Sequence, residues 1–210
     1  MAALLRIDAS PLGIERSFSR QLTQEFVDHW RSANPEGQVI TRDLAHTTLP
    51  PVSAEWIDAV YSPQNGGSTR LNEALAVSDQ LIAELQHADE YVFGVPMYNS
   101  FIPGVLKLWI DQVVRVGKTY AYENGGFKGL LSGKKATIVI SSGGVYEPGT
   151  PSGEKNFVEP YLRGILNQLG VSDVQVVRAG GTGRARHGID RATILETPLA
   201  SIERLFTTAA

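Results

Sequence analysis

Apolar residues recur along the chain with two different spacings, and these predict strands and helices in alternation. Short runs of consecutive apolar residues are typical of buried strands, and the clearest is ATIVIS at 136–141. Apolar residues four positions apart predict a helix, as in the series Phe18, Leu22, Phe26 and Trp30. By these criteria the predicted strands cover 2–9, 38–44, 89–96, 136–141 and 174–179, and the predicted helices cover 18–30, 71–85, 103–113, 158–169 and 191–206.

This regular alternation predicts an α/β fold. The predicted strands are apolar on both faces, which favours a mostly parallel, five-stranded sheet covered by helices on each side. No repeat or linker-like segment interrupts the chain, so we expect 1–210 to form one domain. Two connections, 45–68 and 143–156, are longer than a simple joint requires, and structureless loops of that length are usually functional or mobile.

Composition narrows the classes of function. The chain has 19 basic and 22 acidic residues and a net charge of -3, so no global field favours nucleic acid or anionic lipid. The absence of cysteine excludes disulfides, thiolate zinc clusters and a catalytic thiol, and the four histidines lack the spacing of metal ligands. Residues 1–8 are typical of a first strand and not of a signal peptide, and no apolar run is long enough to span a bilayer. We expect a cytoplasmic protein with no metal, membrane or nucleic-acid partner.

Ligands of parallel sheets bind beyond the carboxyl ends of the strands, so the loops there are candidate sites. In the first loop, Ser10 ends the strand and Ser17 and Ser19 begin the helix, where free N–H groups and the helix dipole can hold a phosphate. The alternative is that Ser17 only caps the helix and Ser10 only forms a turn. Arg16 and Arg20 flank this loop, and each could equally be solvated or contact an anion.

Two further loops carry groups suited to a flat aromatic ligand. In the loop PMYNSFIP at 96–103, the side chains of Met97, Tyr98 and Asn99 can lie along a ring while backbone N–H groups bind its polar edge, although Met and Tyr are also ordinary core residues. The loop SSGG at 141–144 contains paired glycines that allow close approach of backbone to a ligand.

Other nucleotide and hydrolase motifs are incomplete. The nearest approach to the G-x-G-x-x-G fingerprint is at 181–186, where Arg186 replaces the last glycine. Lys135 stands where a P-loop needs Ser or Thr, and the G-x-S-x-G elbow is missing. A dinucleotide Rossmann site, a nucleoside triphosphatase and an α/β-hydrolase are therefore disfavoured.

The three loops, taken together, resemble the FMN-dependent NADH-azoreductase family. The resemblance runs from the first strand to about Val177 and includes the blocks GKKATIVISSGG and SDQLIAELQHADEYVFGVPMYN. It implies a flavodoxin-like fold, one FMN per subunit, NADH or NADPH as electron donor, and a homodimer. The FMN-binding residues that it implies are Ser10, Ser17, Phe18, Ser19, Pro96, Met97, Tyr98, Asn99, Ser100, Ser141, Ser142, Gly143 and Gly144.

The resemblance also implies an activity: reduction of quinones and cleavage of azo bonds to aromatic amines by a ping-pong cycle, with no catalytic side chain because the flavin carries the chemistry. Tyr120, Tyr122 and Tyr146 are the expected substrate-binding residues. Some relatives carry Arg where this chain has Ser142, and a Phe where it has Ser100. The alternative is a flavodoxin-like electron carrier without NAD(P)H turnover, but a net charge of -3 lacks the acidic bias that such carriers use for docking.

Overall fold

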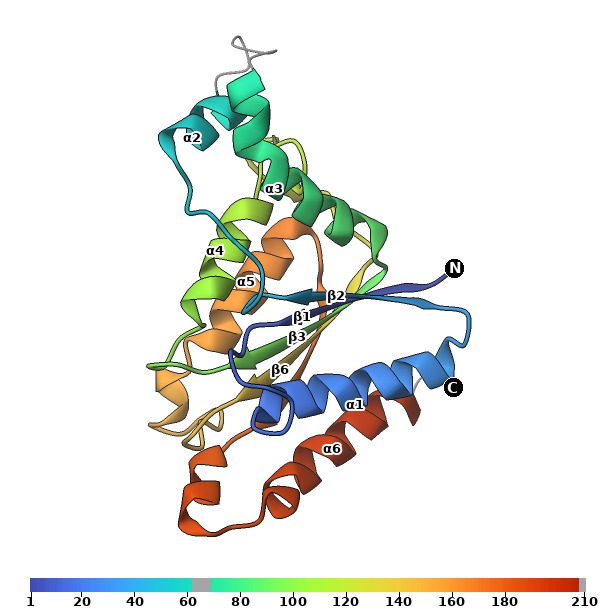
Figure 1. Ribbon diagram of the computed structural model, residues 1–210, viewed down its shortest axis with the longest axis vertical. Helices are drawn as coiled ribbons and strands as arrows, with labels where there is room; N and C mark the ends of the chain where they lie inside the picture. Colours follow the sequence, from blue (N-terminus) through green and yellow to red (C-terminus); the bar gives the residue numbers. More distant parts are fainter. Residues whose placement is uncertain (62–68, 208–210) are drawn as a thin grey trace.

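The computed structural model describes residues 1–61 and 69–207, which form a parallel sheet between two layers of helices (Figure 1). The sheet has five strands in the order β2-β1-β3-β6-β7, and all four strand pairs are parallel. Their bounds are β1 Ala3–Asp8, β2 Gln38–Asp43, β3 Glu90–Pro96, β6 Lys135–Ser141 and β7 Asp173–Ala179. The predicted flavodoxin-like α/β fold is confirmed.

Each face of the sheet buries its own apolar core. Helices α1 (Phe18–Ala33) and α6 (Arg191–Thr207) cover one face, while α3 (Thr69–His87), α4 (Gly104–Val113) and α5 (Val158–Leu169) cover the other (Figure 1). All five helices correspond to predicted ones. Because all five strands run in the same direction, their carboxyl ends and the loops that follow them lie at one edge of the sheet.

Helix α1 illustrates how the sequence positions one of these loops. Leu22, Phe26 and Trp30 are buried against β1, β3 and α6, and burial of each such side chain typically contributes about 1.5–3 kcal/mol. The helix begins after Ser17, which has extended backbone (φ -95°, ψ 116°) and accepts a hydrogen bond from the N–H of Arg20. The apolar stripe therefore fixes where the helix lies, and the serine fixes where it begins.

The predicted connection 45–68 contains a helix, α2 (Ala54–Tyr61), so the interpretation of that connection as structureless is wrong for this part; residues 62–68 lie outside the described residues. Trp56 is buried and donates its indole N–H to Oε1 of Gln112 on α4 (3.0 Å). A helix of eight residues has too few turns for periodicity to reveal it, and it depends on this tertiary anchor.

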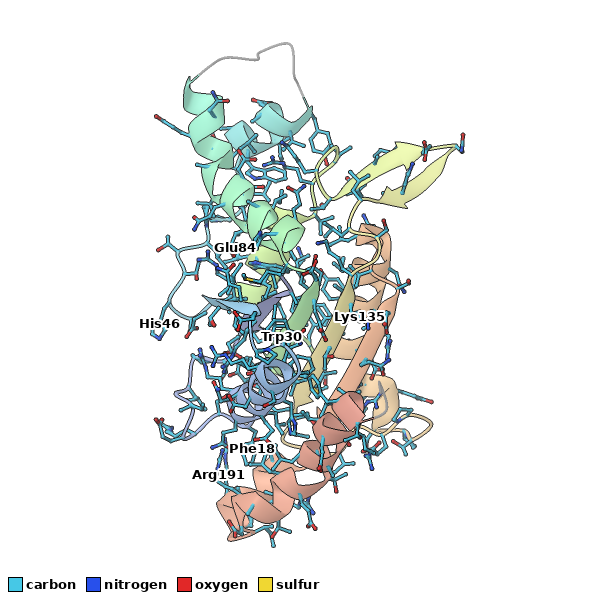
Figure 2. The ribbon with its side chains drawn as sticks, turned by 90° about the vertical axis from the view of Figure 1, so that its right-hand side faces the viewer. Phe18, Trp30, His46, Glu84, Lys135 and Arg191 are labelled. Carbon is cyan, nitrogen blue, oxygen red and sulfur yellow. The ribbon has the colours of Figure 1, made fainter. Side chains whose placement is uncertain are left out.

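A two-stranded antiparallel hairpin of β4 (Tyr120–Glu123) and β5 (Gly126–Gly129) was also not predicted. Its turn residues Asn124 and Gly125 have φ values of 52° and 79°, as an Asn-Gly hairpin turn requires. Figure 2 shows the hairpin projecting from the body at the end of the molecule opposite to the labelled Phe18 and Arg191. None of the described helices is long and apolar enough to cross a membrane.

Candidate flavin-binding site

A cavity of about 690 Å³ lies at the carboxyl edge of the sheet, where β1 and β3 are neighbours and the strand order reverses. All three predicted loops contribute to it. From the predicted site residues, the cavity lining includes Ser10, Ser17, Phe18, Pro96, Met97, Tyr98, Ser141 and Gly143. The structure thus brings together eight of the thirteen residues assigned to FMN.

The first loop presents two hydroxyl groups whose oxygen atoms already accept hydrogen bonds. Ser10 Oγ accepts from the N–H of Leu12 (3.3 Å), and Ser17 Oγ accepts from the N–H of Arg20 (3.3 Å). The hydroxyl hydrogen of Ser10 remains to be donated, and that of Ser17 does so when Ser19 is the donor in the contact between the two hydroxyls. The first N–H groups of α1 have no partner within the helix. Ser17 therefore both caps the helix and lines the cavity, and this end of the cavity is suited to an anion.

Ser19 has a different position from the other two serines. It is fully buried, lies outside the cavity lining, and its hydroxyl is 3.2 Å from that of Ser17. It can therefore orient the hydroxyl of Ser17 but does not itself face the cavity.

The second loop makes a tight turn between β3 and α4. Tyr98 and Phe101 exchange two backbone hydrogen bonds (2.9 and 3.0 Å), and Asn99 and Ser100 between them have φ values of 50° and 67°. This left-handed turn places Met97 and Tyr98 in the cavity wall, with Asn99 and Ser100 at the tip and outside the lining. Phe101 packs against Tyr161, with ring centroids 5.0 Å apart.

The third loop is fixed by the segment that follows β7. The carbonyls of Ser142, Gly143 and Gly144 accept hydrogen bonds from the N–H groups of residues 181–183 at 2.9–3.1 Å. Gly143 lines the cavity, and a Cβ added there would meet no atom within 4 Å. Ser142 and Gly144 lie outside the lining, and a Cβ at Gly144 would contact the ring of Tyr146 at 3.3 Å. Of the two glycines, Gly143 is therefore the one whose backbone a ligand in the cavity can approach closely.

The C-terminal part of the chain supplies a wall that the sequence did not predict. It consists of the short helix η3 (Thr182–His187) and the first residue of α6, Arg191. The Arg191 guanidinium lies 3.8 Å from the centroid of the Phe18 ring and donates to Oε1 of Gln21 (3.0 Å). Figure 2 shows the labelled Phe18 and Arg191 at the same end of the molecule. The sequence did offer one signal for this wall. Glycines follow the fifth predicted strand, and that strand also ends at the carboxyl edge of the sheet.

Charged residues in the lining favour an anionic ligand. They are Glu15, Arg16, Arg186 and Arg191, so three cations face one acid. Arg20 does not belong to this set, because its guanidinium lies beneath the loop and binds Asp43 and the carbonyl of Ser10. Of the two arginines that flank the loop in the sequence, only Arg16 faces the cavity.

The three tyrosines assigned to substrate are not brought to this cavity. Tyr120 and Tyr122 belong to the hairpin, which lies at the far end of the molecule (Figure 2). Tyr120 is buried and Tyr122 is exposed. Tyr146 lines a small adjacent cleft with Met97 and Ser142. A substrate role for Tyr120 and Tyr122 therefore requires a second subunit. Within the described residues, no group of three or more His, Asp or Glu side chains is placed to hold a metal ion.

The sheet order and the cavity at its reversal point define a flavodoxin-like protein. The pattern of the family described as having a flavodoxin-like fold matches residues 2–205. An FMN-dependent NADH:quinone oxidoreductase of Acidobacterium capsulatum is 53% identical over 100% of both chains, and one of Nostoc punctiforme is 46% identical over 85% of this chain and 87% of its own. The crystal structure of an azoreductase from Bacillus anthracis matches with a TM-score of 0.88 and 27% identity, over 99% of this chain and 100% of that one. The chain belongs to the flavodoxin-like family that includes these reductases.

Proposed function

We propose that this chain is an FMN-dependent oxidoreductase that uses NADH or NADPH to reduce quinones and to cleave azo bonds to aromatic amines. One observation carries the proposal: a single cavity joins a helix N-terminus lined with hydroxyls to a wall of Met97, Tyr98 and Gly143. Two relatives bear the name FMN-dependent NADH:quinone oxidoreductase, and a structural neighbour is named azoreductase. These names support the same reaction class here.

The residues present fit FMN. The volume of about 690 Å³ lies within the range of small-ligand sites. A phosphate at the N-terminus of α1 would meet donors from Ser10 and Ser17, and Arg16 and Arg191 line the same cavity. The open space in front of Gly143 leaves room for a flat ring against backbone.

The chain's own groups bind, orient and shield, and none of them needs to act as a nucleophile. Bound FMN supplies the capacity to accept a hydride from a nicotinamide and to pass electrons to a quinone or azo compound. Met97 and Tyr98 would contact the ring of bound FMN, and the N–H groups of Gly143 and Gly144 would stabilise charge at its N1/O2 edge. The hydrogen bonds from residues 181–183 to the carbonyls of that loop hold these N–H groups in place before reaction.

Donor and acceptor are proposed to use one exposed ring face in turn, which gives a ping-pong cycle. The protein is proposed to work as a cytoplasmic homodimer of one-domain subunits, 1–210. In that dimer Tyr120 and Tyr122 of one subunit, with Tyr146, would roof the site. The support is the exposed aromatic surface of the hairpin, where Tyr122 and Phe127 lie 5.0 Å apart between ring centroids.

Steady-state turnover tests the proposal. FMN-saturated protein should accelerate the oxidation of NADH or NADPH when a quinone or an azo compound is present, and double-reciprocal plots at several acceptor concentrations should be parallel. Failure to accelerate NAD(P)H oxidation with bound FMN would support the electron-carrier alternative instead. Intersecting lines would contradict the shared ring face while leaving the reductase activity standing.

A further inference from the structure

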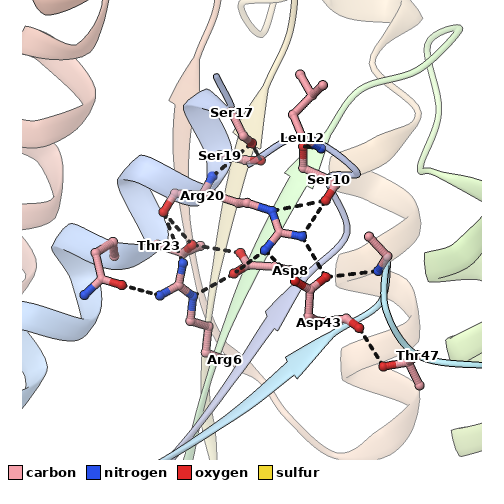
Figure 3. Close-up of polar contacts among 12 residues, drawn as sticks. Arg6, Asp8, Ser10, Leu12, Ser17, Ser19, Arg20, Thr23, Asp43 and Thr47 are labelled. Carbon is pink, nitrogen blue, oxygen red and sulfur yellow. Dashed lines mark hydrogen bonds and ion pairs between the residues drawn. The ribbon is translucent and has the colours of Figure 1, made fainter. Parts of the chain in front are cut away.

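Four charged side chains form a largely buried ion cluster beneath the first loop, and none of them lines the cavity (Figure 3). The cluster consists of Arg6 and Asp8 on β1, Arg20 on α1 and Asp43 at the end of β2. Its two positive and two negative charges balance, so it adds no net charge to the site. Its contribution must therefore come from geometry.

Arg20 connects the loop to the neighbouring strand. Its Nε and Nη2 both donate to the carbonyl oxygen of Ser10 (3.1 and 2.6 Å), while Nη1 and Nη2 donate to the two carboxylate oxygens of Asp43 (2.8 and 2.7 Å). Only the planar fork of a guanidinium can make these contacts together. The hydrogen bond of Asp43 Oδ1 with the N–H of Ala45 fixes the carboxylate in turn (3.0 Å).

The backbone of Arg20 is fixed as well as its side chain. Its N–H is the donor to Ser17 Oγ (3.3 Å), and its carbonyl accepts from Arg6 Nη2 (3.2 Å). Arg6 Nε donates to Asp8 (2.7 Å), whose other carboxylate oxygen accepts from the hydroxyl of Thr23 (2.8 Å). One residue therefore contacts both serines that face the cavity, Ser10 through its carbonyl and Ser17 through its hydroxyl.

A glycine on the neighbouring strand leaves space for this cluster. Asp8 pairs with Gly94 across the β1–β3 ladder, and a Cβ at Gly94 would lie 2.5 Å from Asp8 Oδ1. Burial raises the pKa of the Asp8 carboxyl, against the opposing effect of Arg6 and the Thr23 hydroxyl. Burying a carboxylate costs solvation free energy. The fold nevertheless places the Asp8 carboxylate beneath the loop whose serines line the cavity.

We propose that Arg20 is the positioning residue for the FMN phosphate. Its guanidinium binds the carbonyl oxygen of Ser10, whose partial negative charge would otherwise be free to turn toward the phosphate. By holding the side chain of residue 20 in place, the same contacts also hold its backbone N–H against the hydroxyl oxygen of Ser17. Asp43 holds the Arg20 guanidinium in register, so β2 also supports the site although none of its residues lines the cavity. This inference rests on the proposed FMN-binding function and adds to it residues that act without touching the cofactor.

Flavin titrations of the purified, flavin-free protein test the proposal, with FMN and riboflavin as the two ligands. Arg20→Lys keeps the positive charge but loses the fork, and it should weaken FMN about fivefold or more while changing riboflavin by less than about twofold. Asp43→Asn should show the same selectivity with a smaller loss. Arg31→Lys, an exposed arginine near the other end of α1, is the matched control and should leave both affinities unchanged.

Each result decides the question. A selective loss of FMN in Arg20→Lys supports positioning through the fork. Unchanged FMN affinity in both variants overturns the proposal, and so does an equal loss of FMN and riboflavin, which would mark the cluster as structural. Asp43→Asn decides by the same criteria if Arg20→Lys does not fold. Wild-type protein that binds neither flavin would overturn the proposed function, and this inference with it. Wild-type preference for FMN that neither variant changes overturns this inference alone.

Discussion

The two ends of the molecule differ in what they bury and what they expose. At the carboxyl edge of the sheet, polar groups such as Asp8, Ser17 and Ser19 are buried and have hydrogen-bond partners within the same chain. At the other end, the hairpin exposes the rings of Tyr122 (65%) and Phe127 (59%). The first region holds the candidate flavin site, whose polar groups already have partners, while the second exposes an apolar surface that a partner subunit would cover. Cofactor binding should therefore be a property of one chain, and assembly should depend on the hairpin.

The largest expected effect is at the phosphate end, where the two neighbouring serines have different roles. Ser17→Ala removes a hydroxyl that faces the cavity and should weaken FMN about tenfold or more, because a hydrogen bond to a charged group is worth about 1.5–3 kcal/mol. Riboflavin, which lacks the phosphate, should be nearly unaffected. Ser19→Ala is the matched control, because Ser19 lies outside the lining, and its effect on FMN should be severalfold smaller. Equal losses of both flavins in Ser17→Ala would mean that Ser17 is only a helix cap.

Gly143→Val tests the ring end of the same cavity. The added side chain meets no protein atom within 4 Å at its Cβ, so the fold should tolerate it, but it enters the space assigned to the ring. FMN and riboflavin should both weaken by about tenfold, since the loss of contact does not depend on the phosphate. Gly164→Val places the same side chain in open space on the exposed face of α5 and should change neither affinity. A selective loss of FMN alone would contradict the placement of the ring.

The hairpin should behave in the opposite way. Tyr122→Ala is expected to raise the dissociation constant of the dimer by about tenfold, because an interfacial aromatic commonly contributes more than 1 kcal/mol, while FMN affinity stays within about twofold. Sedimentation equilibrium measures the first quantity and a flavin titration the second. Ile57→Ala, on the exposed face of α2, is the control and should leave assembly unchanged. Wild-type protein with a mass near 22.8 kDa at every concentration would contradict the dimer.

The smallest expected effect concerns pH. Burial acts to raise the pKa of Asp43, but the hydrogen bonds and charge of Arg20 outweigh it and the pKa is lowered. A carboxyl with a lowered pKa in the folded state stabilises the protein above its unfolded pKa, and this contribution is lost as the pH falls through the folded value. Asp43→Asn should therefore cost about 1 kcal/mol of unfolding free energy at neutral pH, and the difference from wild type should narrow in acid. Urea unfolding across the acid range measures this, with Asp28→Asn as an exposed control; a difference that does not change with pH would contradict the ion pair.

Long-range regularity in the sequence was enough to predict the sheet and the helices that cover it. The five strands were predicted from apolar runs and the five long helices from apolar residues at helical spacing. The loops after β1, β3 and β6 could be assigned to one edge because parallel strands share a direction. The short elements lack such a signal. Helix α2 depends on the contact of Trp56 with Gln112, and the hairpin strands have four residues each, although the Asn-Gly pair at 124–125 was a usable turn signal.

Tertiary contacts decided the parts of the site that the sequence did not predict. Arg191 and Phe18 are 173 positions apart in the sequence and meet because α6 packs against α1. No local sequence pattern predicts a contact of that kind. Arg20 has the same sequence context whether it faces solvent, an anion or the interior. The direction of its side chain depends on Asp43, which lies at the end of β2.

The proposed reductase activity separates into two half-reactions, which can be followed one at a time in FMN-loaded protein without oxygen. Addition of one equivalent of NADH or NADPH should bleach the visible absorbance of the flavin before any acceptor is present, and a quinone added afterwards should restore it. We expect both steps, in that order, because donor and acceptor are proposed to use the same ring face in turn. Flavin absorbance that stays unchanged with either nicotinamide would contradict the proposed reductase activity.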